Sequence, residues 1–342
     1  MRQTAGTGDG AAPDSDSGNS GSGDHSGASG GRRGGRWSRG RVPAGLSVVV
    51  ALLLALHRFV PNTPGRVGSL LETFLPWLGL AVPLLLVLAA VRRSYTALAA
   101  SLAPAVVWLV LFGGLLPPGG PGEGGHDLTA LQHNVSDVNP DPQGTAARLL
   151  DAGADIIALE ELSPAVLPAF RSTLAADYPH HAAQGTVGLW SKFPLSGVRK
   201  VDIKPEAVGE GWDRGLRATA HTPRGEIAVY VAHLPSIRLG VGGLKSEWRD
   251  ESSVLLGEAI AAEPLDRVIL LGDLNSTLDD RGLRPVTTRM STPDTDFAFS
   301  WPAKLPVARI DQILTRSARV TSLWTLPATD SDHLPVAARI RF

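Results

Sequence analysis

The chain has 342 residues, of which 43% are hydrophobic and 19% are charged, with a formal net charge of −1 and no cysteine. The lack of cysteine excludes disulfide frameworks, thiolate zinc sites and cysteine nucleophiles. Residues 1–125 carry 10 basic and 6 acidic side chains, whereas residues 126–342 carry 22 basic and 27 acidic ones. This asymmetry excludes a chain that is disordered, fibrous or soluble throughout.

Residues 1–41 form a polar, low-complexity segment with 12 glycines and 7 serines. Such a segment cannot bury enough apolar surface to offset the entropy lost on ordering, so we predict a disordered tail. The end of this tail is basic and holds Arg32, Arg33, Arg36, Arg39 and Arg41. Because these arginines directly precede a hydrophobic run, we interpret them as the flank of a membrane helix rather than as a nucleic-acid site.

Three apolar stretches follow, at about 42–60, 73–91 and 95–116. Each is close to the ~20 residues that a membrane helix needs, and prolines such as those in the second and third are tolerated in lipid. Three such runs in succession leave no amphipathic partner that could cover them as buried core helices. We therefore predict three transmembrane helices within residues 42–116.

The arginines also predict the orientation of these helices. A cluster of arginines precedes the first span, and Arg92 and Arg93 lie in the turn between the second and third spans. The positive-inside rule places both in the cytoplasm, and three spans then place the rest of the chain outside the cell. Residues 117–125 (PPGGPGEGG) are too rich in proline and glycine for a helix or strand, so we predict a short linker there.

Residues 126–342 alternate short β-rich runs with helical stretches. This mixture predicts an α+β domain in the form of a two-sheet α/β sandwich with helices on its outer faces. The predicted helices are 143–152, 164–176 and 246–262. The predicted strands are 128–135, 155–159, 185–192, 198–203, 216–221, 227–234, 267–271, 308–314, 320–323 and 335–342.

Polar side chains stand at the ends of several of these strands and offer carboxylates, imidazoles and amides together. They are Asn134, Glu160, Glu161, His233, Asp273, Asn275, Asp311, Asp332 and His333. The sequence contains neither a serine in a nucleophile elbow nor a glycine-rich phosphate loop, which disfavours covalent serine chemistry and P-loop chemistry.

Seven motifs occur in an order that resembles the endonuclease/exonuclease/phosphatase superfamily, the metal-dependent phosphoesterases that include DNase I, abasic-site endonucleases, inositol phosphatases and neutral sphingomyelinases. The resemblance covers about residues 130–342. Its motifs are the strand end at Asn134, ADIIALEEL (154–162), LWSKFPL (189–195), YVAHL (230–234), LLGDLN (270–275), RIDQIL (309–314) and SDHLPV (331–336).

This resemblance implies a DNase I-like sandwich that uses Mg²⁺ or Mn²⁺ to hydrolyse a phosphoester with water. It implies that Glu161 is the principal metal ligand, that Asn134 positions the metal or the phosphate, and that Asp332 lies near the metal. Glu160 stands where relatives often have glutamine. Ser136 stands where they often have a second asparagine or aspartate, so we leave open whether one or two metals bind.

The resemblance also assigns the catalytic roles. Asp273 and Asn275 orient and deprotonate the attacking water, and Gly272 allows the turn that points both into the cleft. His333 stabilises a phosphoryl oxygen, and Asp311 or Asp332 orients its ring.

Three further basic side chains are weighed beside these residues. His233 is expected to be a second imidazole that faces the phosphate. Arg217 and Arg214 could clamp the phosphate, although charged strand-edge residues are the commoner explanation. A phosphoryl substitution needs an oxygen-ligated cation, a positioned water and donors to the phosphate, and the assigned residues supply these parts.

Three functions compete for this constellation. The first is a membrane-anchored phosphohydrolase that acts on a lipid-linked phosphate or pyrophosphate outside the cell. The second is an extracellular nuclease, which the net charge of −5 over residues 126–342 disfavours. The third is a non-catalytic binding module, which the complete motif set disfavours. We infer no protein partner.

Two finer expectations complete the interpretation. The membrane-anchored layout and Arg-rich, Lys-poor composition resemble actinobacterial teicoplanin-resistance proteins, which implies a cell-wall lipid intermediate as substrate and a role in antibiotic resistance. The segment 238–249 (RLGVGGLKSEWR) is glycine-rich with apolar side chains and is expected to be either a flap over the substrate or membrane, or an ordinary connection.

Overall fold

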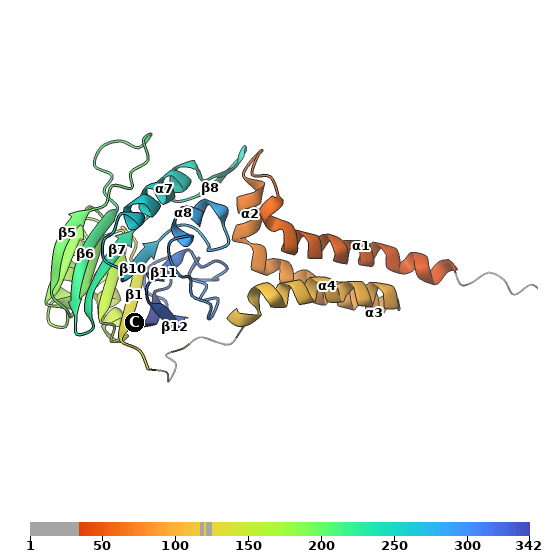
Figure 1. Ribbon diagram of the computed structural model, residues 1–342, viewed down its shortest axis with the longest axis horizontal. Coiled ribbons are helices and arrows are strands. Elements are labelled where there is room, and N and C mark those ends of the chain that lie inside the picture. Colours follow the sequence, from red (N-terminus) through yellow and green to blue (C-terminus); the bar gives the residue numbers. More distant parts are fainter. Residues whose placement is uncertain (1–33, 117–119, 121–124) are drawn as a thin grey trace, which may run out of the picture.

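The computed structural model describes residues 34–116, 120 and 125–342, so most of the predicted tail and linker lie outside the described residues. Figure 1 shows two parts, a helical anchor and a β-rich domain, joined end to end. The anchor consists of α1 (Gly34–Leu56), η1 (His57–Phe59), α2 (Val67–Thr73), η2 (Leu75–Leu80), α3 (Ala81–Val91), α4 (Tyr95–Phe112) and η3 (Gly113–Leu115).

Two segments of the anchor are long and apolar enough to cross a membrane, Gly40–Phe59 and Tyr95–Leu115. They correspond to the first and third predicted spans. The second predicted span, 73–91, corresponds to the helical stretch Leu75–Val91, which is bent by 70° against α2 just before it. By length and composition, two helices of the anchor could therefore cross a membrane, or three if the bent pair counts as one span.

The bend has a local cause in the sequence. Pro76 removes a backbone donor at the start of η2, where the chain tightens into a 3₁₀ helix after Phe74. At the other end of the anchor, α1 begins at Gly34, so residues 34–41 continue the helix instead of belonging to a disordered tail. Arginine is a good helix former, and adding residues to an existing helix is favourable.

The β-rich domain is the predicted sandwich of two mixed sheets. One sheet has the order β12-β13-β1-β2-β4-β3, the other has the order β11-β10-β7-β6-β5, and β8 and β9 form a separate hairpin. The strands are β1 (Leu128–Asn134), β2 (Ile156–Glu160), β3 (His180–Gln184), β4 (Val187–Ser191), β5 (Leu195–Lys200), β6 (Gly215–Thr222), β7 (Gly225–Ala232), β8 (Arg238–Gly240), β9 (Gly243–Lys245), β10 (Val268–Asp273), β11 (Asp311–Arg316), β12 (Arg319–Thr325) and β13 (Val336–Arg341).

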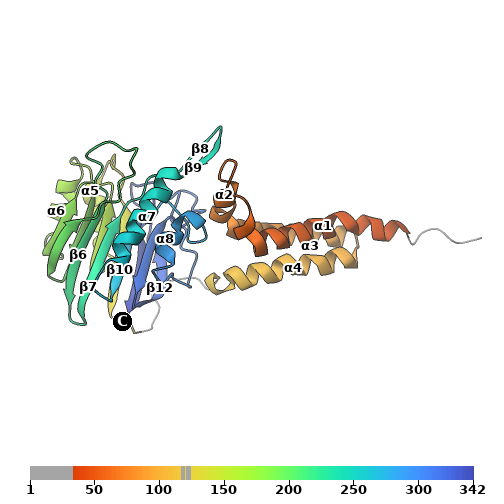
Figure 2. The same ribbon diagram turned by 45° about the horizontal axis from the view of Figure 1, so that its top comes forward.

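Three apolar layers hold the sandwich together, and their helices lie on the outer faces as predicted (Figure 2). One layer lies between the sheets, one between the first sheet and α5 and α6, and one between the second sheet and α7 and α8. The helical elements are α5 (Pro142–Leu150), α6 (Leu167–Leu174), α7 (Glu247–Ala261), η4 (Arg281–Leu283) and α8 (Arg284–Thr287). Strands covered on both faces are almost wholly apolar, as β10 is.

Two strand regions differ from the prediction. His180–Gln184 forms the edge strand β3, although its side chains are only partly buried and give no strong apolar signal. The segment 238–249 contains the β8–β9 hairpin, whose strands meet across Gly240 and Gly243, followed by the start of α7. Both elements depend on pairing with a neighbour rather than on their own burial.

The anchor and the sandwich are joined by polar contacts as well as by apolar packing. Arg281 donates from Nε to Glu72 Oε2 at 2.7 Å and from Nη2 to Glu72 Oε1 at 2.9 Å, and the Glu72 side chain is only 1% exposed. Arg66 Nη1 donates to Asp250 Oδ2 at 2.6 Å, and Trp77 Nε1 donates to the carbonyl of Val307 at 2.7 Å. These bonds fix the end of the sandwich that faces the anchor.

Candidate active site

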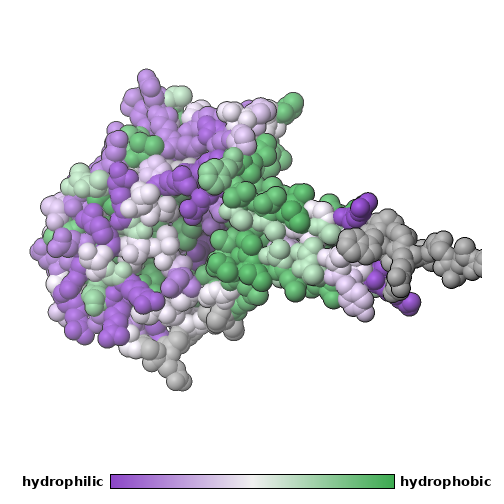
Figure 3. All heavy atoms as spheres, turned by 45° about the vertical axis from the view of Figure 1, so that its right-hand side comes forward, coloured by the Kyte–Doolittle hydropathy of each residue, from purple (hydrophilic) through white to green (hydrophobic). Residues whose placement is uncertain are grey.

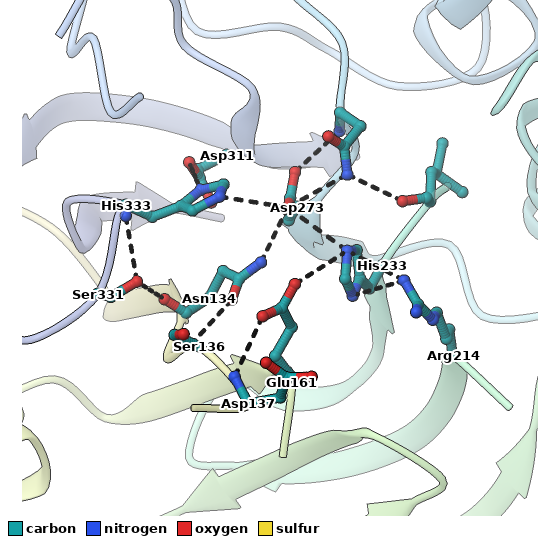
Figure 4. A network of polar contacts seen from close by, with 12 residues as sticks. Asn134, Ser136, Asp137, Glu161, Arg214, His233, Asp273, Asp311, Ser331 and His333 are labelled. Carbon is teal, nitrogen blue, oxygen red and sulfur yellow. Dashed lines mark hydrogen bonds and ion pairs between the residues drawn. The ribbon is translucent and has the colours of Figure 1, made fainter. Parts of the chain in front are cut away.

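The predicted strand ends meet at the anchor-facing edge of the sandwich, and Figure 4 shows the polar network that they form. Asn134 ends β1 in one sheet, and Asp273 ends β10 in the other. The Asn134 amide bridges the two sheets, because its Nδ2 donates to Asp273 Oδ2 at 3.1 Å. Asp273 is also in register with Asp311 of the neighbouring strand β11.

Unusual backbone conformations aim the side chains that follow these strands. Glu161 (φ 60°) and Asn275 (φ 46°) both adopt the left-handed region, which is uncommon outside glycine and often marks functional sites. Gly272 has a φ of 152°, and a Cβ there would collide with the carbonyl of Ala232. Asn275 is held by its backbone N–H, which donates to Asp273 Oδ1 at 2.9 Å, and by Nδ2, which donates to the carbonyl of Leu234 at 2.9 Å.

His333 and Asp311 form a buried pair beside Asp273. His333 Nδ1 lies 2.8 Å from Asp311 Oδ2, and Asp311 also accepts from Gln132 Nε2 at 2.6 Å and from Ser300 Oγ at 2.5 Å. Burial opposes charge on His333, but the carboxylates of Asp311 and Asp273 outweigh it and raise its pKa to about 10. The ring is therefore an imidazolium whose Nε2–H faces Asp273 at 3.8 Å.

Asp273 lies at the centre of the network and is 1% exposed. Burial raises the pKa of Asp273 to about 7, with the charge of His333 opposing and that of Asp311 assisting the shift. Asp311 behaves in the opposite way. Burial would raise its pKa, but the charge and hydrogen bond of His333 and the bonds from Ser300 and Gln132 lower it. The two neighbouring carboxyls therefore have separate pKa values, as acid–base sites commonly do.

His233 and Arg214 face Asp273 and Glu161 from β7 and the start of β6. His233 Nε2 lies 3.6 Å from Asp273 Oδ2 and 3.9 Å from Glu161 Oε1. Burial, together with the charges of Arg214 and His333, lowers the pKa of His233 well below its usual value, so the ring is neutral. Arg214 Nη1 lies 3.3 Å from both ring nitrogens of His233 and adds the positive charge on this side.

Candidate metal ligands occur on both sides of Asp273. Asp273, Asp311 and His333 each place one ligand atom so that all three lie within 4.8 Å of one another. Asp311 already accepts from three donors, and Asp273 accepts from Asn134 Nδ2 and from both the backbone and side-chain N–H groups of Asn275. The oxygens best able to take a hard cation are therefore those of Glu161, with Asp273 beside them. Glu161 Oε2 accepts only a weak bond from the Asp137 backbone N–H at 3.2 Å, and its Oε1 faces His233. The oxygen donors here suit a divalent cation such as Mg²⁺ or Mn²⁺.

The remaining predicted residues lie at different depths. Asp332 lines the cleft with an exposed side chain and is outside the converging group described above. The backbone N–H of Ser136 donates to Asn134 Oδ1 at 3.1 Å, so this segment orients the Asn134 amide. Sequence reasoning did not single out Gln132 or Ser300 as the residues that hold Asp311. Gln132 is two residues before Asn134 in β1, and alternation places the two side chains on the same face of the strand. That spacing was the sequence signal that could have identified Gln132.

Arg217 does not reach the site, which corrects its predicted role in substrate binding. Its Nε and Nη2 donate to both carboxylate oxygens of Glu263 at 2.9 and 2.8 Å, and both side chains are buried. Leu216 and Ala218 face the core between the sheets, so Arg217 faces the opposite side of β6. Arg214, just before the strand, is the arginine at the site.

The two arginines should therefore give opposite mutant phenotypes. Arg217→Ala should lower the free energy of unfolding by about 3 kcal/mol, because it removes the bidentate partner of the buried Glu263 and leaves, among the described residues, only Arg199, 3.8 Å away, as a cation near that carboxylate. Turnover should be unchanged at a permissive temperature. Arg214→Ala should lower turnover about 10²-fold with little effect on stability. Denaturant unfolding and initial rates measured on both variants check this, and each variant is the control for the other. Equal rate losses would contradict the assignment.

Glu160 lies beneath the site and is fully buried, and within the described structure neither carboxylate oxygen has a hydrogen-bond partner. Burial, with Asp311 and Asp273 nearby, raises its pKa well above the usual value. The folded protein thus holds a proton that the unfolded chain releases, and stability falls as pH rises above the unfolded pKa of about 4.3.

Glu160→Gln removes this titration while keeping the size of the side chain. The variant should gain stability over the wild type as pH rises from 5 to 8, at up to about 1.4 kcal/mol per pH unit. Thermal unfolding at several pH values measures the gain. A difference that stays constant with pH would mean that Glu160 is charged in the folded protein.

The polar network opens into a cavity of about 740 Å³ whose wall is partly made by the anchor. Asp273, His333 and Glu161 lie on one side of it. Leu70, Thr73 and Phe74 from the bent segment of the anchor lie on another, and the β8–β9 hairpin adds Leu239 and Leu244. The predicted flap segment therefore lines the cleft, next to a wall made by the helical anchor that sequence reasoning did not anticipate.

The fold and site together define a DNase I-like phosphoesterase. A model of the Endonuclease/Exonuclease/phosphatase family matches residues 108–333, and the chain belongs to this family. It is accordingly a metal-dependent phosphoester hydrolase, as predicted from the seven motifs. Among curated proteins no match was found.

Solved structures share the fold at low sequence identity. Sphingomyelinase C from Streptomyces griseocarneus is 19% identical with a TM-score of 0.50, and the match covers 62% of this chain and 98% of that one. D. rerio TDP2 complexed with a single strand DNA product is 16% identical with a TM-score of 0.53, covering 63% and 99%. An endonuclease/exonuclease/phosphatase from Beutenbergia cavernae is 17% identical with a TM-score of 0.50, covering 64% and 72%. At these identities the likeness concerns the fold alone.

Proposed function

We propose that the protein is a membrane-anchored phosphohydrolase, dependent on Mg²⁺ or Mn²⁺, that acts outside the cell on a phosphorylated lipid, as a phosphoester or a pyrophosphate. The observation that carries this proposal is the composition of the cleft. Catalytic side chains such as Asp273 share one cavity with Leu70 and Phe74 of the anchor. A site that opens at the end of a membrane anchor favours a substrate whose phosphate lies at the bilayer surface.

The metal ion would be held by Glu161, with Asn134 and Asp273 beside it, and Asp332 would act from the rim. Bound there, a divalent cation supplies positive charge for the phosphoryl oxygens. Its ligands are carboxylates whose lone pairs face the cleft, which suits a hard cation.

The protein's own residues supply the rest of the chemistry. Asp273 accepts a proton from the attacking water, and Asn275 fixes the orientation of that carboxylate through the 2.9 Å bond to Oδ1. The His333 imidazolium, held by Asp311, donates to the phosphate as negative charge develops. His233 and Arg214 contribute a neutral imidazole and a cation on the opposite side.

The arrangement of the anchor supports a cytoplasmic N-terminus. α1 and α4 approach the sandwich at their C-terminal ends, whereas Gly40 lies against Ser94 at the remote end, close to Arg92 and Arg93. Figure 3 shows a hydrophobic belt around the helices, with hydrophilic atoms at that remote end. Three spans with the arginines inside would place the site at the outer membrane surface.

Two alternatives have partial support. A DNA-cleaving role agrees with the fold shared with TDP2, whose structure holds a single strand DNA product, but the net charge of −5 over residues 126–342 disfavours binding to a polyanion. A non-catalytic module would not need the Asp311–His333 pair to be satisfied so completely. In its narrower form, the lipid proposal names a cell-envelope lipid intermediate as the substrate. Its hydrolysis would then affect tolerance to glycopeptide antibiotics.

The test compares purified wild type with Asp273→Ala in detergent with Mg²⁺. Each protein is incubated with undecaprenyl pyrophosphate and, in a separate assay, with plasmid DNA. We expect Asp273-dependent phosphate release from the lipid while the DNA stays intact. Asp273-dependent nicking of DNA without lipid turnover would overturn the lipid proposal and establish a nuclease. Absence of any Asp273-dependent turnover would favour the binding module.

A further inference from the structure

A second cavity, of about 420 Å³, lies in the anchor close to the sandwich. Its walls come from η2 and the start of α3 on one side and from α4 on the other, and they include Trp77 and Trp108. The catalytic domain closes it with Phe297 and Phe299. Nearly all of this lining is aliphatic or aromatic, and it belongs to helices that present apolar side chains outward (Figure 3). We call this cavity the anchor groove.

The anchor groove is linked to the catalytic cleft by a third cavity of about 330 Å³. That cavity shares Pro76, Phe297 and Phe299 with the anchor groove, and it shares Thr73 with the catalytic cleft. Adjacent cavities therefore extend from the membrane helices to the side chains around Asp273.

One short segment ties the anchor groove to the chemistry. Phe299 stacks on Trp77 in the groove wall, with ring centroids 5.5 Å apart. The next residue, Ser300, donates to Asp311 at 2.5 Å, and the one after it, Trp301, lines the catalytic cleft. Three consecutive residues thus contact the groove, the catalytic pair and the cleft. A general lipid-facing surface would not require side chains from the catalytic domain.

We propose that the anchor groove holds the hydrocarbon chain of the substrate while its phosphate occupies the catalytic cleft. This inference rests on the proposed lipid phosphohydrolase function and names the subsite that recognises the lipid. A single long chain fits the groove, because its walls are apolar and burial of each methylene favours binding. The chain would leave the bilayer sideways, between α3 and α4, without withdrawing fully from an apolar environment.

The test fills the groove and compares substrates with the same headgroup. Ala105 lines the groove, whereas Ala103 is exposed and lies on the opposite face of α4. Ala105→Trp should raise the KM for undecaprenyl pyrophosphate about tenfold or more and leave turnover of a short, water-soluble prenyl pyrophosphate unchanged. Ala103→Trp should behave as wild type with both substrates.

The outcomes separate the subsite from the function. An unchanged KM of Ala105→Trp for the long-chain substrate would overturn the subsite and leave the lipid function standing. A wild type that cleaves the short substrate but not the long one would overturn both. If Ala105→Trp lost activity on both substrates, labelling of wild type with a long-chain lipid that carries a diazirine in its tail would decide. Labels concentrated at η2, α4 and Phe297–Phe299 support the subsite, whereas labels spread over the outer helix faces overturn it.

Discussion

Asp273→Asn should lower kcat by about 10³-fold or more while leaving the fold intact. The amide keeps the size of the side chain and can still contact Asn134 and Asn275, but it cannot accept a proton from water. It also removes a negative charge from beside the proposed cation. Without the metal, burial raises the pKa of Asp273 to about 7, and a neighbouring cation would favour the ionised carboxylate that accepts the proton.

Asp266→Asn is a matched control, because Asp266 is exposed on the loop just before β10. It should retain wild-type turnover. Rates with the lipid substrate and thermal unfolding curves of both variants measure the effect. A Asp273→Asn variant that keeps more than about a tenth of wild-type kcat would show that another group activates the water.

Strand-end reasoning located most of the polar network because it depends on local pattern. Asn134, Glu161 and Asp273 each follow an apolar run, and in mixed sheets such ends meet at one edge. The pairing of His333 with Asp311 was expected from the family motif, and the sandwich brings them to 2.8 Å. Register places Asp273 beside Asp311 within one sheet, whereas Asn134 reaches Asp273 because the two sheets pack face to face.

Arg217 shows where that reasoning fails. Its partner Glu263 is 46 residues away, at the end of α7, so the ion pair depends on how that helix lies on the sheet. Alternation along β6 held a usable signal, since apolar Leu216 and Ala218 mark the inward face. Arg214 lies just before β6 begins, so the alternation of side chains along a strand does not predict which way it points.

The bent anchor segment was beyond sequence reasoning for a similar reason. Hydropathy detects length and composition, and residues 73–91 satisfy both, but the 70° bend is stabilised by tertiary contacts. The carboxylate of Glu72 binds Arg281 of the catalytic domain, a residue 209 positions away. That contact brings Leu70 and Phe74 into the wall of the cleft. The cleft is therefore formed by both the sandwich and the anchor.

The affinity for Mg²⁺ should depend steeply on pH, falling about tenfold for each pH unit below about 7. A cation beside Asp273 favours the ionised carboxylate, so binding must displace the proton of Asp273 once pH lies below its pKa of about 7. Above that pKa the affinity should be nearly constant. Isothermal titration of the detergent-solubilised protein with Mg²⁺ between pH 5.5 and 8.5 measures the slope, and chelation of the metal should abolish turnover.

Two variants make this result specific. Asp273→Asn should bind Mg²⁺ more weakly at pH 8 but lose the slope, since the neighbouring group that titrates is gone. Glu161→Gln should also bind weakly and should keep the slope, because Asp273 still titrates. If wild type and Asp273→Asn had the same pH dependence, the ion would be bound without any effect on the proton of Asp273, which would contradict its place beside the cation. The slope of Mg²⁺ affinity against pH therefore identifies the carboxyl group that loses a proton when the metal binds, and no substrate is needed to measure it.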